Sequence, residues 1–498
     1  AGMAIMVTYV ETMVLPAFSN FESFFQVTNA STIAWILSAY LLVGVVVTPI
    51  FGKLGDIYGK KRMLLVAMGV YAVAVTIAGF TPQIGGALGL SRPDQIYGLI
   101  AVRAIQGVGM AMFPLGFAML PEVFPPARVG QAQGLLSGMF AAGAAAGLVG
   151  GGWIAQTYGW QDTYHTVIPV AIIVFALAFV FIRESTIRYA RKIDFPGVVS
   201  LGLGLTFLML GITEGAYWGW TSFSSVAFGG ISWGVPEFFI LSLVAFAYFF
   251  YWEPRAPSPV VSFKSLKERN ILISNIDGLL VGMAMFLLFT ILIILGEYPS
   301  PGFGLGELNA ALVFVPAVLS MLVAGPFLGR VIGTRGPKPV MLLGFLLITL
   351  GGFGLVFFHS NSYEVGALAI PMMVGNVASL ISMSNVIVLS VDPKTMGVQT
   401  GMNQTFRNLG SALGPVLVTS ILASFAFTET IQGQNFLNYH ILGYQVVFGL
   451  VGVIGVTGLL CSLALRNFRY LADGSRSGHP GQAPPAEQKL TRDKPAGT

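Results

Sequence analysis

Charged residues are scarce in this sequence, since Asp, Glu, Lys and Arg make up only 9% of 498 residues, against about 25% in soluble domains. So few charges cannot cover the surface of soluble domains of this length, which excludes an ordinary soluble enzyme. Cysteine is nearly absent as well. With Cys461 alone, the chain cannot form an intrachain disulfide, a cysteine-based zinc site or an iron–sulfur cluster.

Signatures of catalysis and of ATP hydrolysis are also missing. No phosphate-binding G-x-x-x-x-G-K-[ST] motif occurs, which excludes an ATP-driven pump that works alone. The histidines show no i, i+4 pair of the kind that binds a metal ion on a helix, and they are His165, His359, His440 and His479. We therefore predict no enzyme, no metal and no cofactor.

Long apolar runs are what the sequence does contain. Apolar residues make up 55% of the chain, and the mean hydropathy is +0.78. The 62 glycines and the length of the runs favour close-packed helices over a β-barrel, whose strands would alternate polar and apolar residues. Fourteen runs of about 18 residues or more lie at 1–18, 30–51, 63–80, 96–119, 131–153, 166–183, 195–213, 235–252, 271–295, 307–329, 339–358, 365–390, 397–425 and 441–465. We predict an all-α integral membrane protein with fourteen transmembrane spans.

The basic residues follow an alternating pattern along the chain. Of 26 Lys and Arg residues, 23 fall in alternate loops and in the tail after the last run. This bias predicts that both termini are cytoplasmic in a plasma membrane. The net charge of +5 therefore reflects topology and does not indicate a nucleic-acid partner. Residues 467–498 are rich in Gly, Pro and charge, which predicts a disordered cytoplasmic tail.

An internal repeat divides the chain. Four glycines recur with the same spacings at an offset of 267 residues: Gly130, Gly134, Gly143 and Gly147 match Gly397, Gly401, Gly410 and Gly414. We therefore predict two six-helix bundles, at 1–184 and 270–466, with two additional transmembrane helices in a linker at 185–269. Paired repeats of this kind place a substrate site near the middle of the membrane in secondary transporters, and we expect a functional monomer.

The segment after the second run carries a specific motif, G-x-L-x-D-x-x-G-x-K-R. It resembles the signature loop of the major facilitator superfamily, which implies that fold and a contact that locks the two bundles together on the cytoplasmic side. The alternative is a basic loop that only sets topology. The motif residues are Gly52, Leu54, Asp56, Gly59, Lys61 and Arg62.

Three charged residues inside the runs are candidates for proton coupling. Glu11 lies about 15 Å along the first run, near the middle of a membrane, and Glu-Thr at this place is similar to the start of the fourteen-span drug:proton antiporter branch of that superfamily. Arg103 resembles the second motif of the family, unless it extends to the outer surface. Glu11 is either a proton carrier or permanently paired with Arg103 or Arg407. Asp277 is either a second coupling site or an interfacial cap.

Glycines and a few polar residues complete the predicted site. Gly143, Gly147 and Gly151 form a smooth face against which another helix could rock, and they resemble the antiporter motif of the family, with Leu148 in place of its proline. That departure favours an importer or facilitator as the alternative. The weaker candidates for a substrate cavity are Tyr40, Gln106, Phe113, Asn376, Asn403 and Arg407.

Taken with the resemblance, these features predict a secondary transporter in the lipid bilayer. The leading hypothesis is export of drugs or other amphipathic small molecules in exchange for protons, with the proton gradient as the only energy source. The second is a major-facilitator importer or facilitator of a metabolite. The third is a non-transporting receptor or scaffold, which the basic motif and the buried Glu11 disfavour.

Overall fold

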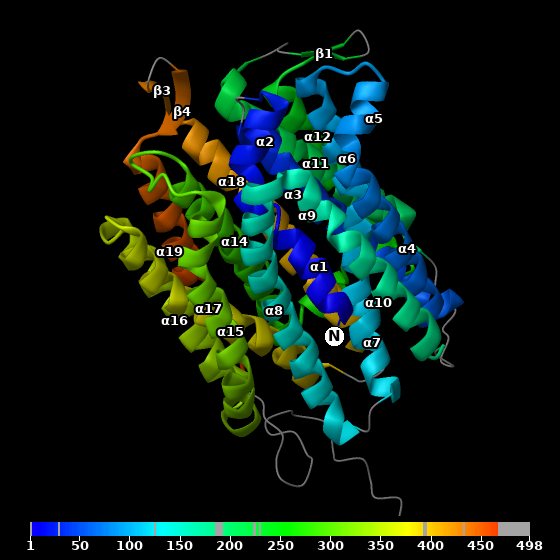
Figure 1. Cartoon of the computed structure of the whole chain (residues 1–498). Helices are drawn as coiled ribbons and strands as arrows, with labels where there is room; N and C mark the ends of the chain where they lie inside the picture. The colour runs from blue at the N-terminus through cyan, green and yellow to red at the C-terminus, as the bar shows by residue number, and fades with distance from the viewer. Residues whose placement is uncertain are drawn as a thin grey trace, which may run out of the picture.

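The computed structural model describes residues 2–27, 30–123, 126–184, 193–222, 226–228, 231–391, 396–431 and 434–466. These residues form long helices that run roughly side by side (Figure 1), so the prediction of an all-α membrane protein is confirmed. Two short antiparallel hairpins in the loops were not predicted. The predicted disordered tail, 467–498, lies outside the described residues.

Twelve helices among the described residues are long and apolar enough to cross a membrane. The other two predicted spans correspond to a shorter apolar segment, Gly2–Ala17, and to helix α8, Pro126–Tyr158. The count of fourteen spans therefore remains a prediction.

The first bundle comprises the helices that precede the linker. Its second and fifth long helices, α3 and α8, face the other half of the chain. Its elements are α1 (Gly2–Thr12), the 3₁₀ turn η1 (Leu15–Ala17), α2 (Phe18–Phe25), α3 (Ala30–Tyr58), α4 (Lys60–Gly79), α5 (Thr81–Ala87), α6 (Arg92–Gln106), the 3₁₀ turn η2 (Gly107–Ala111), α7 (Met112–Val123), α8, α9 (Trp160–His165) and α10 (Val167–Phe181).

The second bundle repeats this order of long helices, with α15 packed against α8 and α18 packed against α3. Its elements are α14 (Arg269–Glu297), α15 (Glu307–Arg335), α16 (Pro337–Phe357), α17 (Ser362–Ser390), α18 (Met396–Ala423), β3 (Ala426–Ile431), β4 (Gln434–Tyr439) and α19 (Ile441–Leu463).

The repeated glycines pack the corresponding helices of each bundle together. A Cβ atom on Gly143 would lie 2.6 Å from the carbonyl oxygen of Ile5 on α1, and one on Gly410 would lie 1.9 Å from the carbonyl oxygen of Leu279 on α14. Only glycine allows backbones this close. The glycine face of α8 thus packs against α1 of its own bundle, and rocking of a helix on this face stays a prediction.

The segment that carries the signature motif is helical almost throughout, and our prediction of a loop there was wrong. Helix α3 continues to Tyr58 and α4 begins at Lys60, so Gly59 alone separates them. Its φ of +111° lies in a region that favours glycine, which explains why the turn needs no other residue. Asp56 therefore lies on the last turn of a helix.

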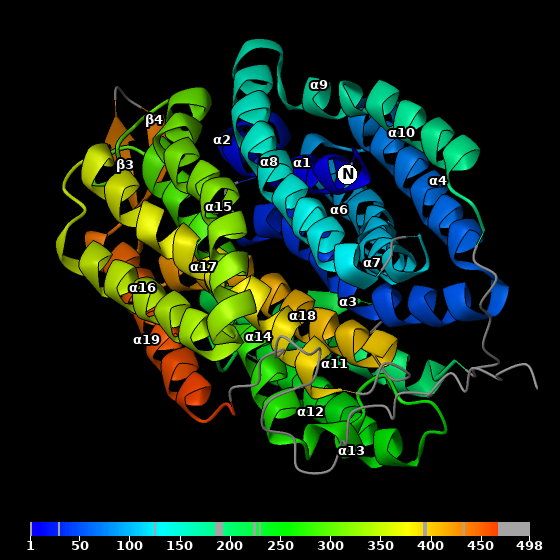
Figure 2. The same cartoon turned by 90° about the horizontal axis from the view of Figure 1, so that it is seen from below.

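The linker forms two long helices, α11 (Phe195–Trp218) and α12 (Val235–Trp252), with a hairpin between them, β1 (Val226–Phe228) and β2 (Ile231–Trp233). Figure 2 shows this pair along one side of the molecule, beside α3 and α18, and α11 packs against both of those helices. The linker then passes through η3 (Glu253–Arg255) and the short α13 (Phe263–Leu266).

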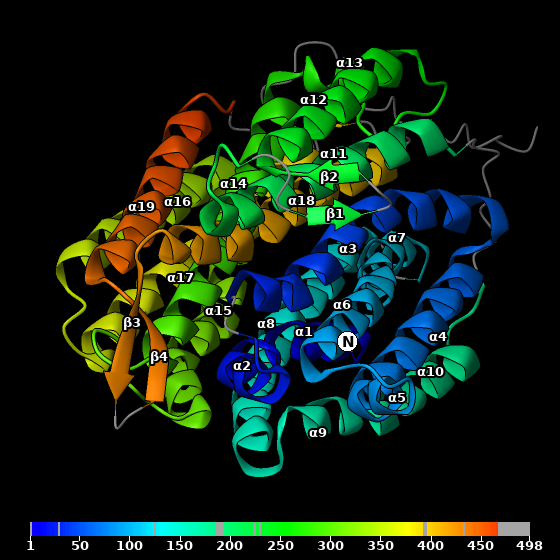
Figure 3. The same cartoon turned by 90° about the horizontal axis from the view of Figure 1, so that it is seen from above.

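Two side chains fasten this part of the linker to both bundles. Lys53 on α3 donates to the carbonyl oxygen of Ser258, and Gln399 on α18 donates to Oγ of Ser265 at 2.6 Å. The linker is therefore attached to each half of the chain. At the opposite end of the molecule, which we call the outer end, the two hairpins lie at separate places (Figure 3).

Candidate functional site

Glu11 lies on α1, whose residues Thr8 and Thr12 bind the preceding turns of their own helix. Its side chain is only 1% exposed. Oε1 of Glu11 has no hydrogen-bond partner among the described residues. A buried carboxylate without such a partner is costly, so this position favours a group that can take up a proton.

Arg103 is fully buried on α6, so the alternative of a side chain that extends to the outer surface is wrong. Its Nε donates to the carbonyl oxygen of Ile36 at 2.9 Å, and its Nη1 donates to Oε1 of Gln106 at 2.7 Å. The guanidinium lies 4.6 Å from the ring centre of Tyr40. These contacts hold a positive charge inside the first bundle.

The backbone after Arg103 changes from an α-helix to a 3₁₀ turn, in which two glycines admit close neighbours. Helix α6 ends at Gln106 and is followed by η2 and α7, so the fourth predicted run is one candidate span but not one continuous α-helix. A Cβ on Gly107 would lie 2.4 Å from the carbonyl oxygen of Tyr40. This close approach of α3 places Tyr40 against the guanidinium.

Arg407 carries a second buried charge to the same region from the other bundle. It lies on α18, is 4% exposed, and its guanidinium is 5.6 Å from the ring centre of Phe140 on α8. The Phe140 ring in turn packs against that of Phe113, with ring centres 5.4 Å apart and the planes tilted by 53°. The charges that act on the Glu11 carboxyl are Arg407 first and Arg103 second. The structure therefore brings Glu11 within electrostatic reach of buried cations from both bundles.

Amides surround Arg407 on its own helix. Nη2 of Arg407 donates to Oδ1 of Asn408 at 3.1 Å. With its amide oxygen turned toward the guanidinium, Gln404 accepts from Nε of Arg407 at 3.0 Å. These partners are neutral, so among the described residues Glu11 is the carboxylate that acts on the charge of Arg407.

The remaining predicted residues lie elsewhere in the second bundle. Asn376 and Asn403 are buried and donate to the carbonyl oxygens of Met372 and Ser274. Asp277 is fully buried, and its Oδ2 accepts from Ser462 at 3.1 Å. Because Asp277 lies eight residues inside α14, it is not an interfacial cap. It stays a candidate for a second coupling site, held within one bundle.

The signature residues lie at the inner end of the first bundle. Gly52 has open space around its Cα, and Asp56 is half-buried on α3. The backbone N–H groups of Lys61 and Arg62 each donate to the carboxylate of Glu184 at 3.0 Å. The start of α4 is thus tied to the end of α10. A lock between the bundles remains a prediction for Asp56.

The outer ends of the two bundles are in contact. Nδ2 of Asn20 donates to Oε1 of Glu307 at 2.7 Å, and the hydroxyl of Tyr298 donates to Oε1 of Glu22. A Cβ on Gly152 would come within 3.0 Å of the carbonyl oxygen of Glu307. The structure therefore shows a conformation in which the outer side is closed.

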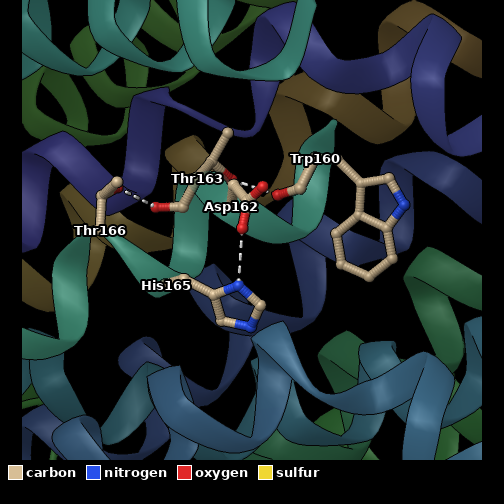
Figure 4. Close-up of polar contacts among 5 residues, drawn as sticks. All are labelled: Trp160, Asp162, Thr163, His165 and Thr166. Atoms are coloured by element: carbon tan, nitrogen blue, oxygen red, sulfur yellow. Dashed lines mark hydrogen bonds and ion pairs between the residues drawn. The ribbon is translucent and has the colours of Figure 1, made fainter. Parts of the chain in front are cut away.

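Helix α9 packs against α2, the helix that carries two residues of this outer contact. Nδ1 of His165 lies 2.8 Å from Oδ1 of Asp162, and Oγ1 of Thr163 donates to the carbonyl oxygen of Trp160 at 2.6 Å (Figure 4). The Trp160 ring is buried against three phenylalanines of α2, with ring centres 5.1 to 5.5 Å away. The same short helix α2 carries Asn20 and Glu22, so the aromatic cluster fixes their position.

The contact between Glu22 and Tyr298 predicts a pH-dependent outer closure. Burial raises the pKa of Glu22 from 4.5 to about 7, although the hydrogen bond from Tyr298 opposes that rise. The closed state holds the proton more tightly than an open, hydrated state. Closure should therefore weaken as the pH rises from about 4.5 to 7, by at most about 3 kcal/mol, and change little above that.

Spin labels at the exposed outer residues Gln83 and Tyr363, in a Cys461→Ser background, would report this change as a distance. The wild-type distance distribution should shift toward the longer, open distances between pH 5 and pH 7.5. In Glu22→Gln the shift should vanish, because the side chain no longer titrates. A shift of the same size in Glu22→Gln would assign the pH dependence to another group.

Several of these residues carry no signal in the sequence. Phe140 is one of 38 phenylalanines, and nothing in its neighbours marks it as the ring that meets Arg407. Asn20 and Glu22 lie in a short segment with no motif. Asn408 is the exception, because an amide beside an arginine inside an apolar run could have been singled out.

The sequence is similar to those of known membrane transporters. The chain is 26% identical over 416 residues to the uncharacterized MFS-type transporter Rv1250 of Mycobacterium tuberculosis, covering 82% of this chain and 66% of that one. It is 27% identical over 407 residues to the tetracenomycin C resistance and export protein of Streptomyces glaucescens, covering 80% and 70%. The chain thus spans about two thirds of the length of these relatives.

A solved structure shares the fold. The human organic anion transporter MFSD10 superposes with a TM-score of 0.55 at 13% identity, over 93% of this chain and 97% of that one. The sequence profile of the Major Facilitator Superfamily matches residues 1–415. With two packed bundles, repeated glycines and this match, the chain belongs to the Major Facilitator Superfamily, whose members are transporters and not enzymes.

Proposed function

We propose that this transporter exports amphipathic small molecules in exchange for protons. The observation that carries the proposal is the position of Glu11, which is buried, has an unpartnered Oε1, and lies under the influence of Arg407 from the opposite bundle. A carboxyl group in this setting changes the charge balance between the bundles when it gains or loses a proton.

The coupling follows from which bundle holds each charge. With Glu11 charged, its attraction to Arg407 favours the arrangement in which these two side chains are close. With Glu11 neutral, that attraction is lost and two buried cations, Arg103 and Arg407, remain. The proton therefore shifts the balance between the two arrangements of the bundles, which is the requirement for exchange.

The groups around Arg407 suit a hydrophobic substrate of variable shape. Phe113 and Phe140 present aromatic faces, and Met110 and Met112 lie directly before Phe113. Aromatic and methionine side chains adapt to different apolar ligands. The name of the Streptomyces relative, a tetracenomycin C resistance and export protein, supports the same direction of transport. We place the protein in the plasma membrane with both termini cytoplasmic.

An importer or facilitator is the second candidate, and Leu148 favours it. This residue replaces the proline of the antiporter motif. It lies in the contact between the bundles, next to Phe289, Phe314 and Met373 of the second bundle. A continuous, well-packed helix at this contact suits a transporter that equilibrates its substrate without a coupled ion.

Flux in inside-out vesicles distinguishes the two candidates. If the proposal is right, an acidic vesicle lumen should drive ethidium or Hoechst dye into the lumen, and collapse of the pH gradient should release it. Vesicles without the protein provide the control. Dye movement that follows only its own gradient, whatever the pH difference, would contradict proton-coupled export and favour the facilitator.

A further inference from the structure

An open groove of about 420 Å³ lies on the side of the first bundle that faces away from the second, near the inner ends of α4 and α10. Its apolar wall consists of Leu65, Val66, Phe175 and Phe179. The two helices pack side by side, as Figures 2 and 3 both show. The groove is separate from the cluster around Glu11 and has no part in the mechanism proposed above.

The inner end of the groove is positively charged. Lys61, Arg62 and Glu184 line it. Both oxygens of the Glu184 carboxylate accept from backbone N–H groups at the start of α4. Nζ of Lys61 donates to the carbonyl oxygen of Phe179 at 2.7 Å and lies 5.5 Å from the centre of that ring. Two cationic side chains thus face one carboxylate that the main chain already binds.

The groove lies at the ends of two membrane-spanning helices, where we expect the surface of the bilayer. Arg62 is in the first turn of α4, and Phe181 ends α10. Beyond the cations, the apolar residues are open to the surroundings, with Val66 43% and Phe179 60% exposed. An occupant must therefore place an anionic group at the helix ends and an apolar chain along residues that lie within the bilayer.

We propose that this groove binds a phospholipid with a negatively charged headgroup. The phosphate oxygens accept hydrogen bonds from the side chains of Lys61 and Arg62. One acyl chain lies along Leu65, Val66 and Phe175. A soluble anion cannot cover the apolar wall, and a soluble protein cannot reach it through the bilayer. The inference does not rest on the proposed transport activity, because it concerns a surface outside the transport path.

Native mass spectrometry of the purified full chain tests the charge requirement. Equal amounts of phosphatidylglycerol and phosphatidylcholine with identical acyl chains compete for the protein. Wild-type protein should retain phosphatidylglycerol preferentially, and Arg62→Gln should lower that preference about fivefold. Arg330→Gln is the matched control, since Arg330 is an exposed cation near the inner end of α15, outside the groove. An equal loss in both variants would overturn the proposal.

A second variant tests the apolar wall without a change of charge. Val66→Trp fills the groove and should displace the lipid, while the protein keeps its thermal unfolding temperature in detergent. Retention of phosphatidylglycerol by Val66→Trp at the wild-type level would overturn the proposal. Two other results would also overturn the proposal. If inorganic phosphate bound in place of phosphatidylglycerol equally well, the groove would hold a free anion. If the mass spectrum showed a dimer that Val66→Trp dissociates, the groove would hold a second copy of the chain.

Discussion

Glu11→Gln should abolish pH-driven accumulation of substrate. The amide has the shape of the protonated carboxyl and cannot release a proton, so each transport cycle would lose its coupled ion. For exchange of one proton per substrate, one pH unit supports up to about tenfold accumulation, because each unit is worth about 1.4 kcal/mol. In the variant, the ratio of lumenal to external dye should fall to one.

The loss should be specific to uphill transport. Downhill exchange of labelled for unlabelled substrate requires no net proton movement and should survive in Glu11→Gln. Asp277→Asn is the control, since Asp277 is equally buried but hydrogen-bonded to Ser462 within one bundle. If Glu11→Gln still concentrates dye with the pH dependence of the wild type, Glu11 is not the proton carrier, and Asp277 becomes the leading candidate.

Gly410→Ala should destabilise the second bundle severely. The added Cβ would lie 1.9 Å from the carbonyl oxygen of Leu279 and 2.9 Å from the backbone nitrogen of Met283. Both neighbours are backbone atoms, so α14 and α18 would have to move apart along their contact. Overpacking typically costs about 1–3 kcal/mol and occasionally more, and a clash with rigid backbone places this variant at the upper end. Thermal unfolding in detergent would show the loss as an earlier transition.

The same helix offers a matched control for this prediction. A Cβ on Gly401 would have no neighbour within 4 Å, so Gly401→Ala adds the same methyl group at no steric cost. Because alanine favours helix by about 1 kcal/mol over glycine, this variant should be as stable as the wild type or slightly more so. Equal unfolding temperatures for the two variants would show that the α14–α18 contact can relax.

The helix packing could be predicted because it depends on local spacing. The repeat of Gly143 and Gly147 as Gly410 and Gly414 marks the same helix contact in both bundles, and α1–α8 and α14–α18 both use it. The burial of Glu11 could be predicted too, since depth along an apolar run follows from helical rise alone.

The partner of Glu11 was harder to predict. The sequence left Arg103 and Arg407 open as partners, because both are cations inside predicted runs. Which of them acts more strongly depends on how α18 packs against α3, a contact between residues hundreds of positions apart. For the same reason the contacts of Glu22 with Tyr298 and of Asn20 with Glu307 had no local signal.

The motif at Gly52–Arg62 shows a different limit. Glycines and charges together are typical of loops, and we predicted one. Helix α3 nevertheless continues to Tyr58, and α4 begins at Lys60. The start of α4 is capped by the carboxylate of Glu184, which accepts from the N–H groups of Lys61 and Arg62. A cap supplied from more than a hundred residues away cannot be recognised from the local pattern.

The attachment of the linker to both bundles sets a size limit on the inner opening. Lys53 holds the chain at Ser258, and Gln399 holds it at Ser265. The seven Cα-to-Cα steps from Ser258 to Ser265 span at most about 25 Å when fully extended. While both attachments last, α3 and α18 cannot separate at their inner ends by more than this tether allows, so the linker fixes the largest cargo that could pass between them.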